Sequence, residues 1–502
     1  MTTAPRFDPR RRRAVTAALI LVTALASFES TVVSTAMPTI IGDLGGLPLY
    51  SWVFSIYLLA ATVMMPVYGR LADIYGRRRI LLVAIAVFLS GAVVCGLART
   101  MPQLILARGV QGLGAAGLVP IALTVSGDLY SLKERARIQG LFSSVWGFAS
   151  LVGPLIGAWM TVSFGWRSIF TINIPLGIVA LSLVATQMVE SRGTLSDPLD
   201  VAGAAALASG VVALLFGVLH EPGSGGIGGV ARAGLLLLAA ASLGLFVRLQ
   251  TKRAHPLIPP ELFRRVSTAA PYAGGVLLGT TIFGVDTFVP LFVQGARGGT
   301  AGAAGAVVTP LVFLWAVSAA VAARLIVRFG FRRTARWGAF LILGGLVGLI
   351  AAAWSNASVP WISAACALVG AGLGPSSMSQ VLAIQNVVPE RQRGVATSLV
   401  PFFRTIGGSI GVGALGGVLA AGLSRRLGAA AETAGRLLAS GSQPAAGVPV
   451  APAAFRVAIE RSLLPVFAVL AGLAVLNLFV TEGFPADAEI PAGAETEAKL
   501  LH

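Results

Sequence analysis

Charged residues are scarce in this sequence. Asp, Glu, Lys and Arg make up 11% of its 502 residues, against about 25% in ordinary soluble domains. A soluble protein of this length would need far more charge to cover its surface. Apolar residues account for 56% of the chain instead, and they form runs of roughly 20 residues, the length that crosses a hydrocarbon core about 30 Å thick. The sequence therefore predicts an integral membrane protein.

Side chains for metal binding and for catalysis are scarce too. The chain has three histidines and two cysteines, and Cys95 and Cys366 both fall inside apolar runs. This pattern implies neither a disulfide framework nor a metal site. The phosphate-binding pattern G-x-x-x-x-G-K-[ST] does not occur, which argues against ATP hydrolysis. We therefore expect no enzymatic activity, no bound metal and no cofactor.

The apolar runs predict fourteen membrane spans. Unbroken runs favour helices, because the strands of a membrane barrel would appear as short alternating segments. The expected fold is an all-α polytopic membrane protein. The spans are predicted at residues 14–38, 50–69, 80–98, 102–127, 138–163, 168–188, 200–219, 231–249, 270–293, 303–327, 337–354, 360–386, 395–421 and 463–481.

The distribution of Lys and Arg predicts the orientation. With the N-terminus inside, the cytoplasmic segments hold 26 of these residues and the outer segments hold nine, while Arg108 and Arg404 lie within spans. This bias places both termini in the cytoplasm. The net charge of +17 is then a topology signal that also faces anionic lipid headgroups, and nucleic-acid binding is disfavoured. The abundance of Ala and Gly and the presence of only three lysines suggest a bacterial cytoplasmic membrane.

The chain also repeats itself. The segment Gly69–Arg79 is similar to Ala323–Arg333, 254 residues later, and Glu134–Arg137 is similar to Glu390–Arg393, 256 residues later. Two matches at nearly one offset indicate two homologous six-helix bundles, as in alternating-access transporters. The predicted parts are a tail (1–13), an N-terminal bundle (14–188), a linker with two extra spans (189–268), a C-terminal bundle (269–482) with a long outer loop (422–462), and a tail (483–502).

Four motifs resemble signatures of the major facilitator superfamily, in its fourteen-span drug:proton antiporter branch. They are Phe28–Pro38, Gly69–Arg79, Arg108–Ala115, and the glycine-rich segment of the fifth span with Gly147, Gly153, Pro154 and Gly157. The resemblance covers nearly the whole chain. It implies two six-helix bundles with two extra central spans, and the fifth-span motif implies export rather than uptake. That branch usually has Asp where Glu29 stands and Asn where Ser34 stands.

The loop between the second and third spans is predicted to act as a conformational latch. Its motif residues are Gly69, Arg70, Asp73, Gly76, Arg77 and Arg78. Glycines allow a tight turn, and arginines resist entry into the bilayer. Asp73 can pair with nearby arginines or cap a helix N-terminus. A simple topology anchor would explain the arginines but not an acid among them. In the second copy Val327 replaces the acid, so any latch there should be weaker.

Only two of the twenty acidic residues, Glu29 and Asp286, lie near the middle of a span. An ionised carboxylate there costs at least ~2.5 kcal/mol, so such residues usually serve ions or protons. The resemblance links Arg108 to proton coupling, and Arg404 is its less certain counterpart in the second half. Structural hydrogen bonding is the alternative role for each. Aromatic residues that could line a cavity are Trp52, Tyr57, Trp146, Phe148, Phe283, Phe288, Phe292 and Trp315.

The sequence is therefore interpreted as a monomeric, proton-coupled exporter of small amphipathic compounds. Protons would load Glu29 and Asp286 from outside and exchange there for a substrate. Three alternatives stay open: export of a lipid or an endogenous metabolite, an uptake symporter or membrane sensor, and a membrane-embedded enzyme. The fifth-span motif argues against uptake, and the missing catalytic clusters argue against an enzyme.

Overall fold

The computed structural model describes residues 9–45, 49–189, 199–219, 229–253, 256–299, 301–355, 357–428 and 452–485. These residues form helices joined by short connections, and no strand occurs among them. Eleven of the described helices are long and apolar enough to cross a membrane. The predicted all-helical membrane architecture is therefore confirmed.

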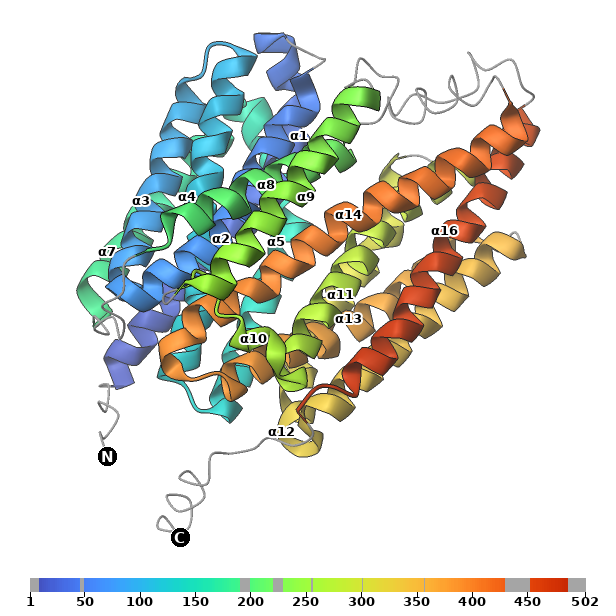
Figure 1. Cartoon of the computed structure of the whole chain (residues 1–502). Helices are drawn as coiled ribbons and strands as arrows, with labels where there is room; N and C mark the ends of the chain where they lie inside the picture. The colour runs from blue at the N-terminus through green and yellow to red at the C-terminus, as the bar shows by residue number, and fades with distance from the viewer. Residues whose placement is uncertain are drawn as a thin grey trace. The chain divides into compact units, whose positions relative to one another are not determined.

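The first half of the chain contains α1 (Pro9–Leu44), α2 (Tyr50–Tyr75), α3 (Arg77–Leu97), α4 (Met101–Leu129), α5 (Leu132–Phe164), α6 (Ser168–Thr171) and α7 (Asn173–Gln187). The middle contains α8 (Val201–Leu219), α9 (Gly229–Lys252) and α10 (Glu261–Arg264). The second half contains α11 (Val266–Leu291) with the π-helical turn η2 (Phe292–Ala296), α12 (Ala301–Trp354), α13 (Val359–Val387), η3 (Glu390–Gln392), α14 (Arg393–Leu427) and α16 (Pro452–Thr481). Figure 1 shows them in chain order.

The predicted spans coincide with these helices, but several boundaries were wrong. α12 covers the tenth and eleventh spans and is broken at Gly330, where φ is 81° and ψ is 173°. The predicted loop 69–79 is helical except at Gly76, because α2 and α3 each extend by about one turn or more beyond the apolar run. α1 takes up part of the predicted tail from Pro9 onward. The number of fourteen crossings stays a prediction.

The long outer loop predicted at 422–462 is shorter than expected. α14 continues to Leu427 and α16 already begins at Pro452. The intervening residues 429–451 lie outside the described residues, as do 190–198 of the linker and 486–502 of the C-terminal tail.

The chain forms two compact units, each built from three separate stretches of sequence. The domain boundaries given above stay a prediction. The first contains residues 1–212, 239–264 and 387–402, and the second contains 213–238, 265–386 and 403–502. The first ten residues of α14, 393–402, thus belong to the first unit, although most of that helix belongs to the second.

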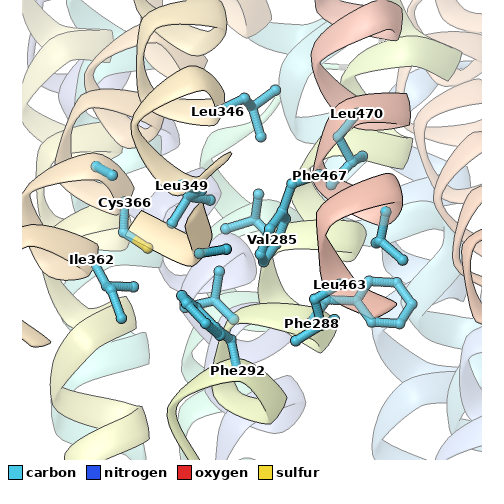
Figure 2. Close-up of a cluster of buried hydrophobic side chains, with 14 of the residues drawn as sticks. Val285, Phe288, Phe292, Leu346, Leu349, Ile362, Cys366, Leu463, Phe467 and Leu470 are labelled. Carbon is cyan, nitrogen blue, oxygen red and sulfur yellow. The ribbon is translucent and has the colours of Figure 1, made fainter. Parts of the chain in front are cut away.

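Each unit is held by its own buried apolar clusters. In the second unit, side chains of α11, α12, α13 and α16 interlock, and Figure 2 shows Phe288 and Phe292 packed among Leu349, Cys366 and Phe467. Phe288 and Phe292 are 3% and 0% exposed. These two aromatic residues, which the sequence left as possible cavity-lining or core residues, are therefore part of a packed core.

Close helix packing recurs in both halves at corresponding glycines. A Cβ atom on Gly114 of α4 would lie 2.2 Å from the backbone nitrogen of Phe88 on α3, and one on Gly372 of α13 would lie 2.7 Å from that of Ile342 on α12. Small residues let helix backbones approach this closely. Two further contacts occur in both halves. Gly112 packs against Tyr57 in the first half, as Gly370 packs against Leu311 in the second. Gly91 packs against Gln111 in the first half, as Gly345 packs against Val369 in the second.

Candidate functional site

A buried ion pair between Glu29 and Arg108 lies inside the first unit. Nη1 of Arg108 contacts Oε1 of Glu29, and the two side chains are 2% and 1% exposed. The other carboxylate oxygen, Oε2, accepts a hydrogen bond of 2.7 Å from Nδ2 of Asn173. The acid thus receives one partner from α4 and one from α7. Breaking such a buried pair by removing one partner typically costs about 3–5 kcal/mol.

Arg108 has partners of its own besides the carboxylate. Its Nη1 donates to Oε1 of Gln111 at 2.8 Å, and its Nε donates to the carbonyl of Val53 at 3.3 Å. The guanidinium also lies over the ring of Tyr57, 4.1 Å from the centroid. A cation on an aromatic face gains about 2 kcal/mol when it is desolvated. Arg108 therefore stays held when its contact with Glu29 changes.

Oδ1 of Asn173, an acceptor beside this pair, has no hydrogen-bond partner among the described residues. Asn173 is fully buried. An unpaired buried amide atom costs about 1–3 kcal/mol, so such an atom calls for an explanation. Here it is a spare acceptor next to a buried carboxylate, whereas the Gln111 side chain interacts with both Glu29 and Arg108.

The sequence identified Glu29 and Arg108 but did not predict that they pair, and it missed Asn173 and Gln111. Gln111 lies three residues after Arg108, so the two share one face of α4. Asn173 is a polar residue near the start of the sixth predicted span. A count of all polar residues in the spans, rather than of acids alone, would have found both.

The second cluster is built around Asp73 at the end of α2. Its Oδ1 and Oδ2 accept hydrogen bonds of 2.9 Å from the backbone N–H groups of Gly394 and Val395. The first turn of a helix leaves such N–H groups without helical partners and favours a negative charge. Arg77 lies 3.7 Å from the same carboxylate. Asp73 thus meets both kinds of partner expected for it.

The arginines of the motif extend this cluster. Nε of Arg77 pairs with Asp128 at the end of α4, and Nη2 of Arg77 donates to the carbonyl of Glu390 at 3.2 Å. Arg393 pairs with the other oxygen of Asp128 at 2.6 Å. The motif and the start of α14 are therefore joined by charge as well as by the cap.

Glycine is required at three points of this cluster. Gly76 has φ of 95° and separates α2 from α3. A Cβ on Gly394 would lie 2.4 Å from Oδ1 of Asp73, and one on Gly69 would lie 2.8 Å from the carbonyl of Gly394. Arg70 is buried, and Arg78 donates to the carbonyl of Ala185 on α7.

The second copy of the motif differs in sequence from the first, and α5 differs from α14 in how it begins. α5 begins with its own capping box, in which Ser131 and Glu134 satisfy each other's backbone groups. Val327, the counterpart of Asp73, offers no acceptor. α5 thus caps itself, whereas the N-terminus of α14 is capped by Asp73.

The second-half candidates are placed differently from Glu29. Asp286 lies on α11 with an exposed side chain, and within the described parts of the chain no ion pair or hydrogen bond involves it. Arg404 lies on α14, where its backbone carbonyl would be 1.9 Å from a Cβ on Gly279 of α11. The packing therefore explains why Gly279 is needed and gives Arg404 no counterpart of the Glu29 contact.

The fifth-span motif lies in α5, which packs along α1. Gly153 and Gly157 are buried and Gly147 is partly buried. The side chain of Pro154 is outside the described ones. The inference of export from this motif stays a prediction.

The family is decided by comparison with known proteins. The family model of the Major Facilitator Superfamily matches residues 19–412. The chain belongs to the major facilitator superfamily. It is therefore a multi-pass membrane transporter and not a member of an enzyme family.

Among its relatives are bacterial drug transporters. The multidrug transporter protein MdtP of Bacillus subtilis is 33% identical over 409 residues, which cover 82% of this chain and 75% of the relative. Multidrug resistance protein 3 of the same organism is 31% identical over 400 residues, covering 80% and 78%. The structure of the proton:xylose symporter XylE aligns over 97% of this chain and 99% of its own, with a TM-score of 0.64 and 13% identity. The last likeness concerns the fold alone.

Proposed function

We propose that the protein is a proton-coupled antiporter that exports small amphipathic compounds, cationic or lipophilic, across the bacterial cytoplasmic membrane. The names of its relatives support drug efflux. The Lys and Arg bias supports cytoplasmic termini. It works as a monomer, in contact with membrane lipids and without a cofactor, and a proton gradient drives the alternation of access.

The observation that carries the proposal is the ability of the Glu29 cluster to accommodate a proton. A protonated carboxyl group has a donor and needs an acceptor. Rotation of the Asn173 amide presents its unpartnered Oδ1 to that proton. Arg108 meanwhile retains Gln111, Val53 and the Tyr57 ring. Both protonation states of Glu29 thus find partners within one buried site.

The Asp73 cluster controls the conformational change of the proposed transport cycle. Its contacts hold the start of α14 against the ends of α2 and α4. Release of that cap is one step of each transport cycle. Asp286 is exposed on α11, and no cation pairs with it among the described residues. It provides a second carboxylate for a proton or a cationic substrate. Export of a lipid or an endogenous metabolite would use the same steps.

The test is transport by purified protein in proteoliposomes with an imposed pH gradient. A panel of cationic, neutral and anionic dyes and antibiotics is screened, and substrate-induced proton movement is recorded with an internal pH indicator. Uphill transport that an uncoupler abolishes supports the antiporter. Transport that needs ATP, or that moves substrate and proton in the same direction, contradicts it.

A further inference from the structure

A polar cluster joins three helices at the end of the first unit that is predicted to face outward. Oδ2 of Asp43, at the end of α1, accepts hydrogen bonds from Nε1 of Trp166 at 2.8 Å and from Nη1 of Arg167 at 2.9 Å. Nη2 of Arg167 donates to the carbonyl of Ala98, which follows α3, at 3.0 Å. These two hydrogen bonds keep the pKa of the Asp43 carboxyl below its ordinary value. Asp43 therefore stays ionised at the acidic outer pH that drives a proton antiporter.

A second polar cluster joins the corresponding helices of the second unit. Arg297, directly after η2, pairs through Nη2 with Oε1 of Glu460 on α16 at 2.9 Å. The same Nη2 donates to the carbonyl of Ala352, in the last turn of α12, at 2.8 Å. Arg297 also lies 4.9 Å from the centroid of the Phe292 ring.

The two clusters occupy matching positions in the repeat, but the acid and the arginine have exchanged sides. Arg297 follows Asp43 by 254 residues, and Ala352 follows Ala98 by the same number. This is also the offset between the two copies of the Gly69–Arg79 motif. In each half a glycine with positive φ follows the charged residue within two positions: Gly45 follows Asp43, and Gly298 follows Arg297. The first helix carries the acid in one half and the arginine in the other.

We propose that these clusters are a pair of outer clamps with opposite polarity, which position the acid-bearing helices α1 and α11 within their own bundles. In each clamp an arginine bridges a carboxylate and a backbone carbonyl at the end of the third span of that half. The carbonyl is that of Ala98 after α3 in the first half and that of Ala352 in α12 in the second. α1 carries Glu29 and α11 carries Asp286. A helix fixed at this end moves with its bundle rather than tilting alone.

The reversed polarity makes each clamp selective for its own half. Asp43 facing Glu460 would place two acids together, and Arg167 facing Arg297 would place two cations together. Like charges at such contacts are unfavourable, and repulsive pairings of this kind suppress wrong partners. Two clamps of equal polarity would lack this discrimination while the chain folds.

The side chains of the two clamps differ in burial, so removing one partner should lower thermal stability by different amounts in the two clamps. The side chains of Arg167 and Asp43 are 43% and 50% exposed, whereas those of Arg297 and Glu460 are 10% and 15% exposed. Exposed ion pairs contribute little, and removal of one partner from a buried pair is strongly destabilising. We expect Glu460→Gln to lower thermal stability more than Asp43→Asn does.

The experiment is a charge reversal with a matched control. Asp43→Arg should lower the transport rate about fivefold and the apparent melting temperature by roughly 2–4 °C, with little change in KM. Adding Arg167→Asp restores the ion pair with inverted polarity and should recover part of both losses. The recovery is partial because an aspartate at position 167 cannot donate to the Ala98 carbonyl and an arginine at position 43 cannot accept from Trp166. The control adds Arg425→Asp instead, which gives the same net charge at an exposed arginine at the end of α14.

Equal behaviour of the two double variants would overturn the clamp, as would wild-type stability and transport in both Asp43→Arg and Glu460→Gln. Only the transport readout rests on the proposed function. If the wild-type protein moves no substrate against a gradient, the proposed function fails, while the pattern of melting temperatures still decides the clamp.

Discussion

Replacing Asp73 by Asn tests the latch most directly. The carboxylate holds two backbone N–H groups of α14, each at 2.9 Å. Asn offers one oxygen for these two donors and brings an N–H group of its own. A hydrogen bond to a charged group contributes about 1.5–3 kcal/mol, and an anion at a helix N-terminus up to ~2 kcal/mol. Because the variant also escapes the cost of burying a charge, a net weakening of about 2 kcal/mol is reasonable.

A weakening of about 2 kcal/mol shifts an equilibrium roughly 30-fold. The hydrogen bonds of Asp73 run to Gly394 and Val395 rather than to the Glu29 cluster, so this shift acts on the population of conformations rather than on the proton site. We expect the transport rate in proteoliposomes to fall by about tenfold or more, while the substrate Kd measured in detergent changes little. A variant that transports at the wild-type rate would leave the motif as a topology anchor only.

Gly394→Ala provides a steric version of the same test without a change of charge. Its Cβ would lie 2.4 Å from Oδ1 of Asp73 and 2.6 Å from the carbonyl of Gly69, so the cap cannot close as it stands. Gly417→Ala is the matched control. Gly417 lies on the same helix, α14, and a Cβ there would meet nothing within 4 Å. Similar defects in these two variants would show that the loss does not come from the cap.

Further predictions concern the carboxylates and the energy source. Glu29→Gln should abolish proton movement coupled to export. Because Arg108 keeps Gln111, Val53 and the Tyr57 ring, the protein should lose less stability than the ~3–5 kcal/mol typical of a buried ion left without partners. The double variant Glu29→Gln with Arg108→Gln should regain thermal stability but not coupling; recovery of coupling would make Glu29 structural. Glu29→Asp should retain part of the transport activity, since the carboxylate remains. Asp286→Asn should weaken transport of cationic substrates more than that of neutral ones, and an equal loss for both would speak against a substrate-binding role. Accumulation in everted vesicles should collapse with an uncoupler and persist without ATP.

The positions of the helices were predictable because crossing a hydrocarbon core requires a run of apolar residues, and each run is visible in the sequence. Their ends were not, because the turns beyond the membrane need no apolar residues. α2 continues through Arg70 and Asp73 to Tyr75, and only Gly76 with its positive φ interrupts the helix. Gly330 interrupts α12 in the same way, and the continuation of helix on both sides of it was not predicted because those turns also lie beyond the apolar runs.

The members of the site were partly predictable, but their partners were not. The energetic cost of a charge in a membrane singles out Glu29 and Arg108 one at a time. Their contact depends on where α4 lies in the bundle. That position depends on small residues such as Gly112 and Gly114, which bring α4 close to α2 and α3 and look like the many other glycines of this sequence. The cap on α14 was foreseen only as one of two possible partners for Asp73, because the helix that would receive it is about 320 residues away.

The two halves have kept the same packing but not the same polar groups. Gly370 and Gly372 follow Gly112 and Gly114 by 258 residues and make the same close contacts. At that offset Arg108 corresponds to Cys366, which is fully buried in the apolar cluster of Figure 2. Helix packing is needed in both halves for stability, whereas a counter-ion is needed only where a buried acid must stay charged. Asp286 is exposed and lacks a matching arginine on α13, so we expect it to meet protons or cationic substrates with no internal competitor for its charge. In the proposed mechanism Glu29, by contrast, exchanges its arginine contact for a proton.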